Sequence, residues 1–456
     1  MSNTNDHALD IGGEHGIKLP GITNESKDAV KKLLKTDFEE NHIFFNNRRF
    51  HNHITHHLLA CYSIGAQEER LKKIYFGERL MQRPKVDHKY DITESNWTKF
   101  LNDEFAYTDY ANFFLEQISK NGLKQTFEKY AFSEPLFNRL TSGIFHPLIH
   151  VGYGLEFENE LMMAEGLAMT AVHIDHVPEE HSFFTQSSPE SSTSLIEIFS
   201  QIKTDKRFDL IKYHTEDKFD TLIENRSHVI REYVDKWYVA SENLNVKIKE
   251  LYDLIAVMYG STAIRPDKRG EIRLSFVLMH CLTSMYFVEI FTHYTPESHI
   301  VPFLRNYLFA VIGHYVAEGR PQVHKTTLWE YKSNNSENTL YEWDDIIQKT
   351  INVEDEHACK VIRSLYNAHV VCGHSALYLN AAQMTLDHIQ SVMDWSGDSI
   401  GFDEAWNPMS YGESMKRTFI GAIDKLTGVP VVTMTAVTNK TIDKMKEWKN
   451  YITQAE

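Results

Sequence analysis

The chain contains little cysteine, with four residues among 456. Cys61, Cys281, Cys359 and Cys372 stand far apart in the sequence, and no Cys-x-x-Cys pair occurs. This spacing indicates neither a disulfide framework nor a familiar thiolate zinc motif. We therefore expect a reducing compartment, and cytoplasmic is the expected location.

Positive charge and long apolar runs are also scarce. Lys and Arg number 47 against 63 Asp and Glu, which gives a formal net charge of -16. That balance argues against nucleic acid or an anionic membrane surface as a partner, because both attract clustered positive charge. The N-terminus lacks the basic start and apolar run of a signal peptide. The most apolar long segment, residues 276–291, contains His280 and Glu289 and is shorter than a membrane span, so it predicts a buried helix.

Glycine-rich phosphate loops are absent as well. Residues 152–154 read Gly-Tyr-Gly, but Phe157 occupies the third glycine position of G-x-G-x-x-G and no predicted strand precedes it. Small residues that permit close helix packing are the better interpretation. No Walker-type loop and no G-x-S-x-G elbow occurs. The chain therefore carries no motif for a bound nucleotide, a flavin or the common type of serine hydrolase.

Helical periodicity, in contrast, covers most of the chain, and 42% of the residues are hydrophobic. Only residues 429–437 have the β-branched density of a strand, and Pro430 would restrict them to a sheet edge. We predict a mostly-α fold, a large helical body of packed helix-turn-helix pairs in one or two lobes. The expected units are an irregular N-terminal lead-in (1–24), an N-terminal helical lobe with the histidine-rich motifs (25–184), a low-complexity loop (185–194) and a C-terminal helical lobe continuous with the first (195–456).

Capping residues and apolar spacing place the individual helices. Ser26 is a candidate N-cap for a helix over residues 26–34, and Gly65 should end a helix that begins near Ile54. Residues 322–340 are expected to form a long polar excursion. Further helices are predicted over residues 68–76, 97–100, 107–118, 123–132, 143–156, 158–173, 195–202, 224–239, 246–259, 271–294, 300–317, 343–350 and 356–393.

A histidine-rich segment at residues 50–59 is the most unusual feature of a sequence that has 24 histidines in all. His53, His56 and His57 follow the three- and four-residue spacing of one side of a helix. The apolar residues of the segment are expected on the opposite side, facing the core. His51 precedes this turn and is expected only to cap or orient it.

A second segment, residues 146–157, places His146 and His150 one helical turn apart, with Pro147 in the first turn of the helix. His173 and His176 close the next predicted helix. Any one such ring is best interpreted as a buried polar residue satisfied by hydrogen bonds. Several buried titratable rings, however, are costly without partners, and together they suit proton transfer in a pocket for a phenolic aromatic molecule.

A metal centre is the main alternative use for these rings. No H-E-x-x-H motif occurs, and the Glu-x-x-His pairs at 39–42 and 354–357 lack the matching helices of a di-iron bundle. A mononuclear site of His53, His57 and a carboxylate is geometrically possible. The sequence favours histidines that act as acid–base groups along one wall of an aromatic pocket, and no metal is predicted.

The same segments carry a resemblance to a known family, the questin oxidase-like proteins of fungal aromatic polyketide pathways. The more specific shared motifs are residues 50–66, residues 146–157, the Glu-Gly-Leu-Ala stretch at 165–168, and His173. Weaker similarity includes His280, residues 318–321 and residues 355–363, and it fades from about Trp395.

The resemblance implies a Baeyer–Villiger-type monooxygenase that uses O₂ to open a ring of an anthraquinone-like polyketide in secondary metabolite biosynthesis. It implies an association with NADPH, used to reduce the substrate, and no tightly bound flavin. A small aromatic molecule is then the expected partner. We predict that the catalytic residues, a base and its orienting groups, are His53, His57, His146 and His150, with His173, His280 and His357 as further candidates. The predicted substrate-binding residues are Tyr62, Tyr153, Arg320, Lys360 and Arg363.

Two other functions stay open at this point. The same histidines could serve a metal-dependent oxygenase or hydrolase. The chain could also be a non-catalytic helical protein that binds aromatic ligands, because members of one fold can differ in activity.

Overall fold

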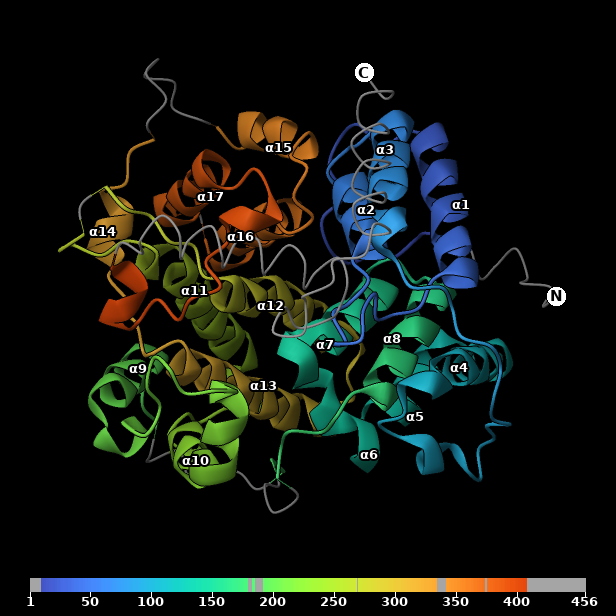
Figure 1. The fold of residues 1–456 in the computed structure, drawn as a ribbon, viewed down its shortest axis with the longest axis horizontal. Coiled ribbons are helices and arrows are strands. Elements are labelled where there is room, and N and C mark those ends of the chain that lie inside the picture. The colour runs from blue at the N-terminus through green and yellow to red at the C-terminus, as the bar shows by residue number, and fades with distance from the viewer. Residues whose placement is uncertain are drawn as a thin grey trace, which may run out of the picture.

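The computed structural model describes residues 10–178, 183–184, 192–268, 270–333, 342–373 and 375–407. Within these residues the chain consists of helices joined by turns, with a few isolated bridges and no sheet (Figure 1). The predicted mostly-α fold is confirmed. The predicted strand at residues 429–437 and most of the low-complexity loop lie outside the described residues.

The first three helices pack against one another at the N-terminal end of the fold (Figure 1). They are α1 (Asn24–Glu40), α2 (Ile54–Ser63) and α3 (Glu68–Glu78). The predicted N-cap of α1 is wrong, because Thr23 takes that position. The Thr23 hydroxyl accepts a hydrogen bond from the Ser26 backbone N–H at 3.1 Å, and the Ser26 hydroxyl accepts one from the Thr23 N–H at 3.0 Å. This reciprocal capping box starts the helix before Ser26.

A second group of helices follows, of which α7 and α8 approach each other closely. The group consists of α4 (Tyr107–Asn121), α5 (Leu123–Ala131), α6 (Glu134–Phe137), α7 (Ser142–Glu156) and α8 (Glu160–Val172). A Cβ added at Gly166 would lie 2.7 Å from the Val151 backbone N, and one at Gly152 would lie 2.4 Å from the Phe287 ring. The interpretation of the glycines in α7 as close-packing residues is confirmed.

The rest of the chain forms a third group, of α9 (Leu195–Thr204), α10 (Lys218–Asp235), α11 (Leu244–Thr262), α12 (Phe276–Tyr294), α13 (Glu297–Ala317), α14 (Lys325–Trp329), α15 (Trp343–Ile351), α16 (Ala358–Cys372) and α17 (Ala376–His388). Two predictions for this part of the chain differ from the structure. The single helix expected over 356–393 is two helices, because Gly373 takes a left-handed φ of 101° that ends α16. The polar excursion at 322–340 includes the short helix α14, whose Leu328 is buried.

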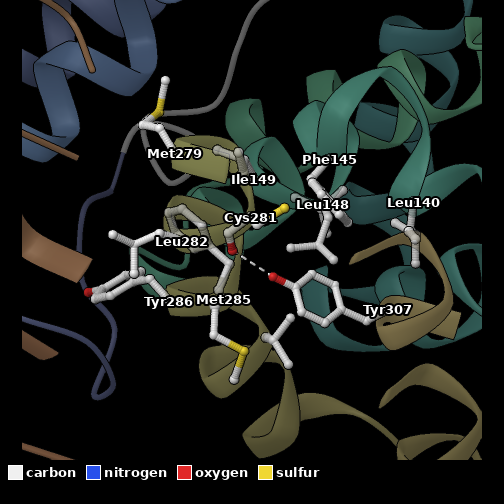
Figure 2. Packing of buried hydrophobic residues seen from close by; sticks show 14 of the residues in the cluster. Leu140, Phe145, Leu148, Ile149, Met279, Cys281, Leu282, Met285, Tyr286 and Tyr307 are labelled. Atoms are coloured by element: carbon white, nitrogen blue, oxygen red, sulfur yellow. Dashed lines mark hydrogen bonds between the residues drawn. The ribbon is translucent and has the colours of Figure 1, made fainter. Parts of the chain in front are cut away.

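The core is organised around α12, which contacts α7, α11, α13 and α16 (Figure 1). Figure 2 shows Met279, Leu282 and Met285 of α12 among the apolar residues of its neighbours. The Tyr307 hydroxyl of α13 donates to the Cys281 carbonyl at 2.8 Å (Figure 2). Among the described residues α12 and α13 are apolar enough to cross a membrane, but 72% and 94% of their apolar windows are buried in the protein. The prediction of a buried helix at 276–291 is confirmed.

Irregular segments at the two ends of the described chain pack on this helical body. In the lead-in, the Gly12 N–H donates to the Phe157 carbonyl at 2.8 Å and the Ile17 N–H donates to the Tyr286 hydroxyl at 2.9 Å. After α17, Ser396 forms a bridge to Ser275, the N-cap residue of α12. Both segments therefore belong to the packed structure.

Candidate active site

The start of α2 is fixed by Asn52. Its side-chain oxygen accepts a hydrogen bond from the Ile54 N–H at 3.0 Å, while its amide nitrogen donates to Asp37 of α1 at 2.8 Å. The preceding loop doubles back, so that Phe44 forms a bridge with His51. These contacts bring both His51 and His53 to the interior end of α2.

The start of α7 is an unusual turn. Gly143, Ile144 and Phe145 have left-handed φ values of 53°, 54° and 65°, and the regular helix begins at His146. Pro147 therefore lies in the first turn of the regular helix, as predicted. Non-glycine residues rarely adopt this conformation, and it costs about 1–2 kcal/mol for each. The Gly143 position is required, because a Cβ there would lie 2.5 Å from the His173 ring.

That turn also determines which nitrogen of His146 carries a proton. His146 Nδ1 lies 2.6 Å from the Gly143 carbonyl oxygen, which can only accept a hydrogen bond. Nδ1 is therefore protonated, and Nε2 presents a lone pair. His280 is held in the same way, because its Nδ1 lies 2.7 Å from the Phe276 carbonyl. Its Nε2 is buried and has no hydrogen-bond partner.

Eight imidazoles converge at the junction of α2, α7, α8, α12 and α16, and we call them the histidine cluster. His51 stacks on His146 with ring centroids 3.8 Å apart, and His53 Nε2 lies 2.8 Å from His146 Nε2. His280 and His357 have centroids 5.3 Å apart. The cluster consists of His51, His53, His56, His146, His150, His173, His280 and His357, of which all except half-buried His53 are buried.

Six of the seven predicted catalytic histidines belong to this cluster, and His57 does not. His57 Nδ1 lies 2.5 Å from Glu78 Oε1 of α3. Every residue of α2 is buried, so the side of the helix that carries His56 and His57 faces the protein interior as well as the apolar side. The expectation for His51 is wrong, since its Nε2 lies 2.6 Å from His173 Nε2 within the cluster.

Three of the five predicted substrate-binding residues lie near the histidine cluster, and the other two have different neighbours. Tyr153 stacks on His56 with centroids 5.1 Å apart. Arg363 Nη1 donates to the Tyr153 hydroxyl at 3.3 Å, and its other amino group binds the buried Glu156. Lys360 is buried, and burial lowers the pKa of its amine against the opposing effect of Glu356.

Tyr62 and Arg320 have other neighbours. The Tyr62 ring lies 6.2 Å from Phe157, beside the lead-in. Arg320 donates to the Asp205 carbonyl at 2.8 Å and to the Asp209 carboxylate at 2.9 Å, at the end of α9. These contacts are with residues outside the histidine cluster.

Burial and neighbouring charges favour the neutral form of several rings in the histidine cluster. Burial, reinforced by neighbouring cationic and imidazole groups, lowers the pKa of His53, His146 and His280 well below the usual 6.5. The same causes lower the pKa of His173 to about 3. Imidazoles with such pKa values are weak general bases at neutral pH, but neutral imidazoles are ready metal ligands.

The cluster contains a group with metal-ligand geometry. Ligand atoms of His53, His280 and His357 all lie within 4.8 Å of one another. Glu356 Oε1 lies 3.5 Å from Nδ1 of both His53 and His357. Backbone carbonyls or carboxylates that fix the second ring nitrogen are the usual support of metal-binding histidines. These residues could therefore hold a transition-metal ion.

Comparison with known proteins assigns this architecture to a family. The questin oxidase-like family model matches residues 50–365, a stretch that includes the whole histidine cluster. The chain belongs to the questin oxidase-like family. Membership makes the protein an oxidative enzyme, and the interpretation as a non-catalytic binder is no longer favoured.

Several characterised relatives align over most of their length. The questin oxidase of Aspergillus terreus is 23% identical over 435 residues, which cover 85% of this chain and 94% of the relative. The Baeyer-Villiger oxidase AgnL3 of Paecilomyces divaricatus is 25% identical over 78% of this chain and 81% of its own. The oxidoreductase AflY of Aspergillus parasiticus is 26% identical over 82% of each chain.

In this questin oxidase-like chain a line of hydrogen bonds leads away from the cluster. His56 Nε2 lies 3.0 Å from His150 Nδ1, and His150 Nε2 lies 3.4 Å from Glu165 Oε2. The Tyr107 hydroxyl donates to Glu165 Oε1 at 3.1 Å. Sequence reasoning assigned no role to Glu165 or Glu356, although each lies within a motif shared with the family. Their contacts depend on helices that the sequence alone does not bring together.

Proposed function

We propose that the protein is a Baeyer–Villiger-type monooxygenase that opens a ring of an anthraquinone-like polyketide. The buried histidine cluster inside the family-matched region is the observation that carries this proposal. The printed names of the relatives support it, since they include a questin oxidase and several Baeyer–Villiger oxidases. The alignments span most of those proteins, so the whole catalytic body has a counterpart here.

The surroundings of the cluster suit a planar phenolic substrate. The Phe276 ring lies 4.5 Å from His280 and 5.1 Å from His357, and the Trp395 ring lies 6.2 Å from His357. Aromatic rings favour offset or edge contacts with another aromatic system. Neutral imidazoles accept hydrogen bonds from phenol hydroxyls. We expect these groups to hold and orient a polycyclic quinone or hydroquinone.

The proposed reaction inserts one atom of O₂ between the ring carbonyl and its neighbouring carbon, which gives a lactone. The second oxygen atom leaves as water, and NADPH supplies the two electrons through reduction of the substrate quinone. In a metal-free version, a cluster histidine takes the phenol proton and the reduced substrate reacts with O₂ directly. The lowered pKa values of His53 and His146 work against that proton transfer.

A metal-dependent oxygenase is the second candidate, and the grouping of His53, His280 and His357 favours it. A bound transition-metal ion would supply Lewis acidity and electron transfer to O₂. His53, His280 and His357 would contribute neutral nitrogen ligands, and the Nε2 atom of His280 is already oriented by a backbone carbonyl. This candidate differs from the expectation that no metal is bound, and elemental analysis decides between them.

Oxygen uptake with a dihydroxyanthraquinone and NADPH tests the proposed function. Wild type should consume O₂ and release a lactone, and His280→Ala should lower the rate at least ~100-fold through loss of an oriented site residue. The matched control is His228→Ala, an exposed histidine of α10 that should leave the rate unchanged. Unaltered turnover in His280→Ala, or no lactone from any tested quinone, would contradict the proposal.

Elemental analysis of the same preparations separates the two candidates. Stoichiometric iron, copper or manganese that is lost in His280→Ala together with activity supports the metal-dependent reaction. Full turnover by metal-free protein in the presence of a chelator supports the metal-free reaction.

A further inference from the structure

A second group of ligand-type side chains lies where α2 meets α16, and the histidine cluster does not include it. His57 and Cys61 are one helical turn apart on α2, and Cys359 lies on α16. One imidazole nitrogen and the two sulfur atoms lie within 4.8 Å of one another. All three residues are buried, with exposures of 0 to 1%.

The orientation of His57 is the independent observation at this position. Its Nδ1 is engaged by Glu78 Oε1 at 2.5 Å, whereas its Nε2 is buried and has no hydrogen-bond partner. A buried polar nitrogen without a partner costs about 1–3 kcal/mol. A carboxylate that fixes one ring nitrogen while the other remains available is the usual arrangement of a metal-ligating histidine.

The donor set defines the kind of ion. Two thiolates and one imidazole form a soft set that prefers zinc(II) to the hard cations magnesium and calcium. The Glu78 carboxylate and two thiolates favour a cation at this position, whereas the nearby positive groups of Arg70, Lys360 and Arg363 oppose one. Neither cysteine forms a disulfide, and the Cys359 thiol donates to the Glu356 carbonyl at 3.8 Å, a contact that zinc binding would replace.

We propose that His57, Cys61 and Cys359 form a Cys₂His zinc site that is distinct from the histidine cluster. Binding replaces the thiol protons, and any proton on His57 Nε2, with bonds to the ion, and no electron transfer is involved. The site joins α2 to α16, the two helices whose N-caps are His53 and His357. Zinc would therefore fix the separation of two walls of the active site.

Cobalt(II) substitution of metal-depleted full-length protein tests this site directly. Thiolate-bound cobalt has a sulfur-to-metal charge-transfer absorption that imidazole-bound cobalt lacks. We expect the absorption in wild type and in His280→Ala, and its loss in Cys61→Ser and Cys359→Ser. Cys372→Ser is the matched control and should keep it, because Cys372 is half-exposed at the end of α16 and outside the group. Absence of the absorption from wild type, or its persistence in both site variants, would overturn the proposal.

A second measurement on wild type avoids any folding defect of the variants. Zinc should slow alkylation of Cys61 and Cys359 at least ~10-fold, measured by peptide mass spectrometry, and should leave Cys372 unchanged. Equal alkylation with and without zinc, or a disulfide between Cys61 and Cys359 in the purified protein, would overturn the assignment. The outcome is independent of the proposed oxygenation, because His280→Ala disables that reaction and leaves these three ligands intact.

Discussion

At the scale of single residues, the defining property of this protein is the burial of ionisable groups. The tautomers of His146 and His280 are set by the carbonyls of Gly143 and Phe276, and not by other side chains. Glu318 and Asp355 are buried carboxyl groups close to the same helices, and burial raises the pKa of both. Because each unit of pKa shift corresponds to about 1.4 kcal/mol, such groups couple the charge state of the protein to its stability and activity.

Glu165→Gln should impair turnover through His150. The carboxylate lies 3.4 Å from His150 Nε2 and accepts a hydrogen bond from Tyr107, whereas an amide would remove its charge with little change in shape. As a positioning residue, Glu165 should affect kcat about 10–100-fold and alter the pH profile of kcat. Steady-state kinetics across pH measure this, with the exposed Glu116→Gln as control. An unchanged profile would show that the line of hydrogen bonds has no catalytic role.

Glu318→Gln should change how stability depends on pH. Burial raises the pKa of Glu318 from 4.5 to about 7, against the hydrogen bond that Ser275 donates. The folded state therefore binds this proton more tightly than the unfolded state, and wild type loses stability as pH rises from about 4.5 to 7. The loss is on the order of 3 kcal/mol. Melting temperatures of both proteins across that range should diverge, and parallel curves would contradict the assignment.

At the scale of elements, close helix approach is what brings the histidines together. Gly166 of α8 lets the α7 backbone come within reach at Val151, one residue from His150. The left-handed turn at the start of α7 leads into His146, whose Nε2 lies 2.8 Å from His53 Nε2 at the N-cap of α2. Both the Gly166 contact and this turn are backbone features. A small change in how α7 packs on α8 should therefore shift His146 and His150 together.

Gly166→Ala should destabilise the protein by about 1–3 kcal/mol, because its Cβ would meet the backbone of α7, which cannot rotate away. Gly77→Ala provides a matched control in α3, where nothing lies within 4 Å of the added carbon. It should stabilise by about 0.5–1 kcal/mol through helix propensity. Chemical denaturation measures both, and equal effects of the two substitutions would contradict the packing argument.

Much of this organisation follows from sequence patterns of short range. The helices over 107–118 and 246–259, and the position of Pro147, depend on local spacing and were predicted correctly apart from their ends. The role of His51 depends on a loop that doubles back, and the direction of His57 depends on α3 and α16. Cys61 and Cys359 look unrelated in sequence, because only the packing of α2 on α16 brings them together.

At the scale of the whole molecule, helices from the two ends of the sequence depend on each other for burial. α7 packs along α12, and α2 contacts α16. We predict that a fragment of residues 10–178 will not fold cooperatively, because the face of α7 that α12 covers would meet water. Near-ultraviolet circular dichroism and thermal melting test this. A sharp transition like that of the full chain would contradict it.

The segment that follows α17 has an evolutionary consequence. The Trp395 indole N–H donates to Asp355 at 3.0 Å, beside His357, yet Trp395 lies beyond the region matched by the family model. Trp395 thus adds an aromatic ring beside His357 from a part of the chain that the family model does not match. Mutations there can remodel the ligand's surroundings while every histidine stays in place. We expect relatives to differ in substrate choice through this segment while they keep the same catalytic histidines.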